Sequence, residues 1–398
     1  MSAAHSTHFQ DGTREQRRAS WALFFAGLAT FALLYCVQPL LPELAKTFDV
    51  SPASSSLALS MTTLSMAACL LIMGALSESW GRKAVMVMAL GLAVFFGLVS
   101  AWAGSWTVLL SARMLLGVAL SGLPALAMAY IGEEFDPTAI AKAMGLFISG
   151  NALGGLTGRL LAGALSDWHG WRWALAGIGL LGLCSLVMFV YLLPRSRHFE
   201  AQPMSLSGLA NNFVQHLRNT CLLRLFALAF LLMGSFVALF NYIAFQLAAP
   251  PFLLSQILIG LLFVVYLLGI VGASLASRWV TRFGAVTVMQ GGVVCMMVGV
   301  ILCLSNTLAV VIVGLSAVVF GFFAAHAVAS GQVGVRAKHA KAQASALYLS
   351  AYYLGSSIIG YGMGYVWEHG SWLAFIAAIV AVLAVALVCV SSLKRGLA

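Results

Sequence analysis

Residues 225–277 read LFALAFLLMGSFVALFNYIAFQLAAPPFLLSQILIGLLFVVYLLGIVGASLAS, and these 53 residues contain no Asp, Glu, Lys or Arg. Residues 283–335 form a second charge-free run of the same length. A helix that crosses a bilayer needs about 20 apolar residues, so each run holds two spans joined by a tight turn. Pro-Pro at 250–251 marks the turn in the first run, and Ser-Asn at 305–306 marks it in the second.

The composition of the whole chain agrees with these two runs. Of its 398 residues, 62% are hydrophobic and 8% are charged, whereas a soluble domain has roughly 45–50% apolar and about 25% charged residues. These values exclude a cytosolic enzyme, a disordered protein and a secreted disulfide scaffold. We therefore expect an integral membrane protein.

Applied to the whole chain, the same length rule predicts twelve transmembrane helices. The apolar runs are continuous and show no period-2 alternation, which favours helices over a barrel. The predicted spans lie near residues 20–42, 54–76, 84–103, 106–130, 142–165, 173–194, 223–248, 256–277, 285–304, 308–331, 342–366 and 372–392.

The basic residues predict the orientation in the bilayer. On this topology 17 of the 21 Lys and Arg residues fall on the face that carries both termini. The positive-inside rule then places both termini in the cytoplasm. We assign the net charge of +10 to basic residues at the cytoplasmic membrane surface. We therefore expect contacts with lipid and no nucleic-acid partner. Seven scattered cysteines without C-x-x-C spacing predict neither disulfides nor a metal site.

The second half of the chain repeats the first. Residues 143–171 read AMGLFISGNALGGLTGRLLAGALSDWHGW, and residues 344–372 read ASALYLSAYYLGSSIIGYGMGYVWEHGSW at a shift of 201. Pairs in register include Ser149/Ser350, Gly154/Gly355, Gly163/Gly364, Asp167/Glu368 and Trp171/Trp372. A parallel repeat of six helices places a substrate site between the halves, near the midplane.

This repeat divides the chain into three parts. Residues 1–194 form an N-terminal six-helix bundle, residues 195–222 a cytoplasmic linker, and residues 223–398 a C-terminal six-helix bundle. The linker carries apolar residues at helical spacing, which predict a short interfacial helix: Leu206, Leu209, Phe213 and Leu217.

Three motifs resemble a known family. GALSESWGRK at 74–83 resembles the G-x-L-x-D-R-x-G-R-K signature of the major facilitator superfamily, and RMLLG at 113–117 resembles its R-x-x-x-G motif. LATFALLYCVQPLLP at 28–42 resembles the YnfM-like branch, proposed exporters among the drug/proton antiporters. The resemblance implies an all-α fold of twelve transmembrane helices in two pseudo-symmetric bundles, which transports by alternating access.

By the same resemblance, the first motif forms a cytoplasmic gate where the halves meet: Gly74, Glu78, Gly81, Arg82 and Lys83. Glu78 should face the positive end of the eleventh helix. Acidic partners for Arg82 are available at Glu133, Glu134 and Asp136. The alternative is a plain positive-inside anchor.

The fifth helix resembles an exporter motif, G-x-x-x-G-P-x-x-G-G. Gly150, Gly154 and Gly158 keep its spacing, but Gly155 replaces the proline and Arg159 replaces the last glycine. The alternative for the three spaced glycines is close packing with the eighth helix.

Ionisable groups inside spans are functional candidates because they are costly there. All eleven acids lie at the rims, whereas Arg113, Arg159 and His326 lie deeper. A cationic lining attracts anionic or polar cargo. The alternatives are structural: Arg113 binds backbone carbonyls of a broken helix, and His326 is a packing histidine. Glu43 is the best proton-accepting carboxylate and a candidate partner of Arg113 or Arg159, and His326 is a second proton-coupling candidate.

Helices 1, 4, 5, 7, 10 and 11 line or flank the cavity in the family. Polar side chains on them complete the predicted substrate site, together with the two arginines and His326: Tyr35, Gln38, Asn151, Asn241, Tyr242, Tyr348 and Tyr352.

The sequence therefore predicts a monomeric exporter of small organic molecules in a bacterial inner membrane, driven by protons and without a cofactor. One alternative is a facilitator or symporter of organic anions or sugars with an Arg-lined cavity. Another is a non-transporting membrane receptor. An enzyme is not expected, since no H-E-x-x-H, G-x-S-x-G or midplane acid pair occurs.

Overall fold

The structure is a computed structural model that describes residues 8–197, 206–337 and 339–393. Side chains at helical positions 74–75, 77–79, 141, 206–207, 209 and 342 lie outside this description. The predicted gate residues Gly74 and Glu78 are therefore not described, and neither are the side chains of Leu206 and Leu209.

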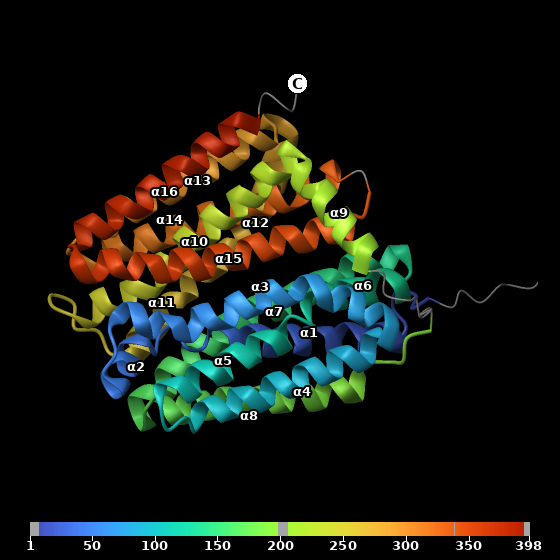
Figure 1. The fold of residues 1–398 in the computed structure, drawn as a ribbon, viewed down its shortest axis with the longest axis horizontal. Helices are drawn as coiled ribbons and strands as arrows, with labels where there is room; N and C mark the ends of the chain where they lie inside the picture. Colours follow the sequence, from blue (N-terminus) through green and yellow to red (C-terminus); the bar gives the residue numbers. More distant parts are fainter. Residues whose placement is uncertain (1–7, 198–205, 338, 394–398) are drawn as a thin grey trace, which may run out of the picture.

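Long helices account for almost all of the described chain, and no strand occurs within it (Figure 1). The first half contains α1 (Arg14–Tyr35), α2 (Leu41–Phe48), α3 (Pro52–Trp80), α4 (Arg82–Ala101), α5 (Trp106–Leu120), α6 (Pro124–Glu134), α7 (Pro137–His169) and α8 (Trp171–Leu192). The second contains α10 (Thr220–Ala248), α11 (Gln256–Leu262), η1 (Phe263–Tyr266), α12 (Leu267–Phe283), α13 (Ala285–Leu302), α14 (Leu308–Arg336), α15 (Lys341–His369) and α16 (Trp372–Leu393).

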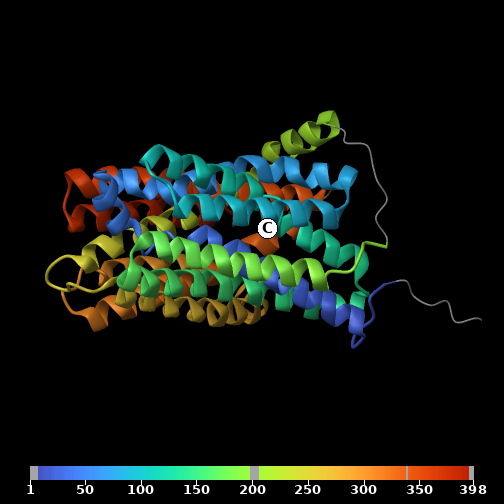
Figure 2. The same ribbon diagram turned by 90° about the horizontal axis from the view of Figure 1, so that it is seen from below.

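The two halves lie side by side, and their helices run in roughly the same direction (Figures 1 and 2). They meet where α3 packs on α15 and where α7 packs on α11 and η1. We call the end with the start of α1 and the end of α16 the terminal end, and the opposite end, with α2 and residues 249–255, the far end. The linker helix α9 (Leu206–Arg218) forms as predicted and lies outside the bundle of long helices (Figure 2).

Three of the twelve predicted spans are interrupted. The first breaks between α1 and α2, the fourth between α5 and α6, and the eighth at η1. Pro42 and Pro124 lie in the first turns of α2 and α6, where proline is tolerated because its missing N–H is not needed. Within the described residues, eleven helical stretches are long and apolar enough to span a membrane. The remaining predicted span is α15, whose 29 residues include several Tyr and Ser.

The predicted packing glycines Gly150, Gly154 and Gly158 do lie at a tight helix contact. A Cβ added to any of them would lie 2.7–2.9 Å from a backbone Cα of α1. Their partner is therefore α1, and the expected packing with the eighth helix is wrong for these three. Gly163 contacts the predicted eighth helix instead, which begins with α11, and it lies opposite Gly260 there.

The polar N-terminal tail contains one anchored aromatic residue. Phe9 is 1% exposed, and its ring lies 5.5 Å from that of Phe135 at the turn between α6 and α7. The Phe9 N–H donates to the Glu134 carbonyl over 2.8 Å, and its carbonyl accepts from Asp136 N–H over 3.2 Å. The tail is thereby fixed to the α6–α7 turn.

Candidate functional site

Arg159 of α7 lies in the middle of the interface between the halves. Its side chain is buried, and its guanidinium carbon lies 4.3 Å from the Tyr35 ring, 4.8 Å from the Phe263 ring and 4.6 Å from the Tyr266 ring. Tyr35 belongs to α1, whereas Phe263 and Tyr266 belong to η1 of the other half. Three ring faces around one cation stabilise it by cation–π attraction.

A chain of polar side chains continues from Arg159 into the second half. Arg159 Nε donates to Gln38 Oε1 over 2.8 Å, and Gln38 Nε2 donates to Asn241 Oδ1 over 3.0 Å. Gln38 lies in the break after α1, and Asn241 lies in α10. Two buried donors near this chain, Asn241 Nδ2 and Tyr266 Oη, have no hydrogen-bond partner within the described part of the protein. These groups are available to a ligand with acceptor atoms.

The Arg159 charge has no acidic counterpart. No carboxylate oxygen of the described residues lies within the 4.0 Å of an ion pair. A buried charge is costly unless it is paired. The site can therefore gain free energy by binding an anion, or a neutral group rich in acceptors.

Arg113 is equally buried but is bonded to three backbone carbonyls. Its Nε donates to the Ala58 carbonyl over 2.9 Å, and its Nη1 and Nη2 donate to the carbonyls of Leu33 and Leu34 over 2.8 and 2.7 Å. The break after Tyr35 leaves the last carbonyls of α1 without helical partners. The structure therefore favours the structural alternative for Arg113 and disagrees with its expected role as a substrate ligand.

Glu43 does not pair with either arginine, so that expectation is wrong. Its carboxylate accepts from Ser166 Oγ and from the Trp171 backbone N–H, the latter over 3.0 Å. The break after α1 carries Glu43 onto α2 at the far end, where it caps the N-terminus of α8 within the first half.

His326 of α14 lies in an aromatic stack with residues of α15. Its ring centroid lies 5.5 Å from that of Phe322 and 4.9 Å from that of Tyr352, and its Nδ1 shares a hydrogen bond of 2.9 Å with Tyr348 Oη. Tyr352 also lies within electrostatic range of Arg159. His326, Tyr348 and Tyr352, which were predicted as site residues, thus lie together on α14 and α15 next to the Arg159 site.

Two predicted site residues lie elsewhere. Asn151 faces α1 beside Gly27. The Tyr242 ring lies 5.3 Å from the Phe375 ring, and its hydroxyl lies beside Ser56 of α3, away from Arg159. Conversely, Phe263 and Tyr266 were not predicted as site residues from the sequence. The only available signal was two aromatic residues in an otherwise aliphatic run.

The described part of the predicted gate lies at the terminal end. Arg82 binds Glu133 through two bonds, Nη2–Oε1 at 2.7 Å and Nε–Oε2 at 3.2 Å, as the sequence suggested. Lys83 Nζ donates to the Leu193 carbonyl. Gly81 has a φ of 91°, which favours glycine at the start of α4. Both Arg82 and Glu133 belong to the first half.

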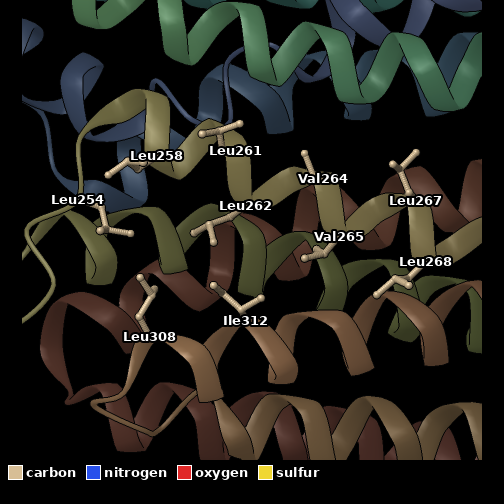
Figure 3. Close-up of a pocket in the computed structure, with 10 residues that line it drawn as sticks. All are labelled: Leu254, Leu258, Leu261, Leu262, Val264, Val265, Leu267, Leu268, Leu308 and Ile312. Atoms are coloured by element: carbon tan, nitrogen blue, oxygen red, sulfur yellow. The ribbon is translucent and has the colours of Figure 1, made fainter.

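An apolar groove of about 550 Å³ lies on the surface of the second half (Figure 3). Eight aliphatic side chains of residues 254–268 line it together with Leu308 and Ile312, and none of them offers a polar group to a substrate. Because its lining matches lipid chains, we assign the groove to the membrane-facing surface and not to the substrate site.

The matches with known proteins agree with this architecture. A family described as Major Facilitator Superfamily matches residues 23–249. The chain belongs to the major facilitator superfamily. The inner membrane transport protein YnfM of Escherichia coli is 47% identical over 97% of this chain and 93% of that protein. The uncharacterized MFS-type transporter YybF of Bacillus subtilis is 43% identical over 96% and 94%.

Solved structures show the same twelve-helix fold at low identity. The nucleoside transporter NupG has a TM-score of 0.76 at 15% identity, and the human organic anion transporter MFSD10 has 0.74 at 18%. Both matches cover 94% of this chain and 99% of the other. This major facilitator is therefore a multi-pass membrane transporter and not an enzyme, and the receptor alternative finds no support.

Proposed function

We propose that this protein exports small organic molecules across a bacterial inner membrane by alternating access, driven by the proton gradient. Its membership of a transporter family supports transport, and the relative in Escherichia coli is named an inner membrane protein. The excess of Lys and Arg on the face of the termini supports a cytoplasmic terminal end and a periplasmic far end. One chain contains both halves of the site, which suits a monomer.

The polar chain Arg159–Gln38–Asn241 is the observation that carries this proposal. It joins the two halves deep between them, where a substrate bound by both would lie. Rocking of the halves must stretch or break the Gln38–Asn241 bond. A substrate that replaces this bond would therefore be coupled to the conformational change. His326 and Glu43 remain the proposed proton-coupling groups of this exporter.

The unpaired charge of Arg159 favours a second candidate, a carrier of organic anions. In that case the anion neutralises Arg159 when it binds, and no separate midplane carboxylate is needed. The similar fold of a human organic anion transporter is compatible with this candidate.

Proteoliposomes distinguish the two candidates. Vesicles are loaded with benzoate or with benzamide, its neutral amide, and efflux is followed with and without an imposed pH gradient. Proton-driven export predicts efflux that responds to the gradient and is abolished by a protonophore. Efflux of benzoate that ignores both treatments would exclude proton coupling and support the anion carrier. Vesicles that contain Arg159→Gln protein are the matched control.

A further inference from the structure

Two carboxylates occupy corresponding places in the internal repeat. Asp167 lies in the last turn of α7 and Glu368 in the last turn of α15, and the two are in register at the shift of 201. Both lie at the far end. Asp167 is exposed and Glu368 is half-buried, so water reaches both from that side.

Each carboxylate binds a helix N-terminus of the opposite half. Asp167 accepts from the backbone N–H groups of Gln256 and Ile257, over 3.0 and 2.8 Å, in the first turn of α11. Glu368 accepts from the N–H of Ala53 over 2.7 Å, in the first turn of α3. Helix N-termini offer free N–H donors and a positive dipole end, so an ionised carboxylate binds there well.

A glycine lies one helical turn before each carboxylate and lets the halves approach closely. A Cβ at Gly163 would lie 2.6 Å from the Gln256 carbonyl oxygen, and one at Gly364 would lie 2.6 Å from the Ala53 Cα. Gly163 and Gly364 also correspond in the repeat. The far end is therefore closed at two pseudo-symmetric points, each with one glycine and one acid.

We propose that Asp167 and Glu368 form a two-point latch that closes the periplasmic mouth, in which each carboxylate holds a helix N-terminus of the opposite half. The inference rests on the proposed orientation and on transport by alternating access. When the mouth opens, the carboxylates and the freed N–H groups bind water, which reaches both points from the far end.

Other polar and ionisable groups surround the latch. His169 lies on the same helix as Asp167. The Glu43 carboxylate accepts a hydrogen bond from Ser166, the residue before Asp167. Tyr361, Tyr365 and His369 lie on the helix of Glu368, and Tyr242 faces it from α10. The first turns of α3 and α11 carry no ionisable side chain.

Amide hydrogen exchange of the full chain in nanodiscs tests the latch without a known substrate. The amides to follow are those of residues 53–58 and 256–262. We expect Asp167→Asn combined with Glu368→Gln to exchange at least about tenfold faster there at neutral pH, because the closed mouth loses both charged acceptors.

Asp49→Asn is the matched control, because it neutralises an exposed carboxylate at the same end, at the C-cap of α2 within one half. It should leave both segments protected. If the double variant does not fold, the single variants and Asp167→Ala report on each contact separately. Wild-type protection in the variants would overturn the latch. Flux that ignores a pH gradient while the exchange results hold would refute proton-driven export and leave the latch intact.

Discussion

Replacement of Arg159 should weaken the binding of anions selectively. At roughly 4 Å, a carboxylate and a guanidinium attract by about 4 kcal/mol at an effective dielectric constant near 20. Part of this is lost because three aromatic rings already stabilise the free cation. A net contribution of about 1.5–3 kcal/mol, typical of hydrogen bonds to charged groups, corresponds to roughly a 10- to 150-fold change in Kd.

Isothermal titration of purified protein with benzoate and benzamide measures this effect. Arg159→Gln should weaken benzoate binding by that factor and leave benzamide binding within about twofold. Arg159→Lys keeps the charge but loses the planar group that stacks on the rings, so its affinity for benzoate should lie in between. Thermal shifts with the same two ligands provide an independent readout, because a ligand stabilises only the state that it binds.

Two results would refute the reasoning. Unchanged benzoate affinity in Arg159→Gln would mean that the charge does not contact the ligand. An equal loss for benzoate and benzamide would mean that Arg159 only maintains the shape of the site.

Three further predictions concern the scaffold of the site. Arg113→Met should lower the free energy of unfolding by about 3 kcal/mol or more, measured by thermal melts, because it leaves three buried carbonyls without donors; a variant as stable as wild type would contradict this. Gly158→Ala should cost about 1–3 kcal/mol through the crowded α1–α7 contact, whereas Gly145→Ala, whose Cβ meets no atom, should cost nothing in the same melts. Phe9→Ala should speed amide exchange at Asp136 by about tenfold, because the tail loses its buried anchor; unchanged exchange would show that the backbone bonds alone hold the tail.

The twelve spans and their division into similar halves could be predicted because bilayer thickness is a strong constraint. A charge-free run of 53 residues admits few structures other than two helices and a turn. The interruption at η1 could not be predicted in this way. Its residues are as apolar as their neighbours, so hydropathy does not distinguish a helix from a break.

The candidate site was harder to predict because residues of the same type play different roles in it. Arg113 and Arg159 are both buried arginines inside spans, and the sequence predicted a cationic cavity lining for both. Their partners differ because α1 breaks after Tyr35, which presents two free carbonyls to Arg113, whereas Arg159 binds Gln38 and the Gly155 carbonyl of its own helix. Nothing in the local sequence indicated which arginine would bind these carbonyls.

The breaks themselves connect scaffold and site. Gln38 lies two residues after the C-cap of α1, and Arg113 holds the carbonyls of Leu33 and Leu34 just before it. Arg113 thereby fixes the direction in which Gln38 reaches both Arg159 and Asn241. On the other side, η1 presents Phe263 and Tyr266 to the same guanidinium. Non-helical backbone is tolerated at this depth only where protein buries it. Two of the three broken spans thus converge on Arg159, and the part of the chain that is least favourable in a membrane is the part that shapes the proposed substrate site.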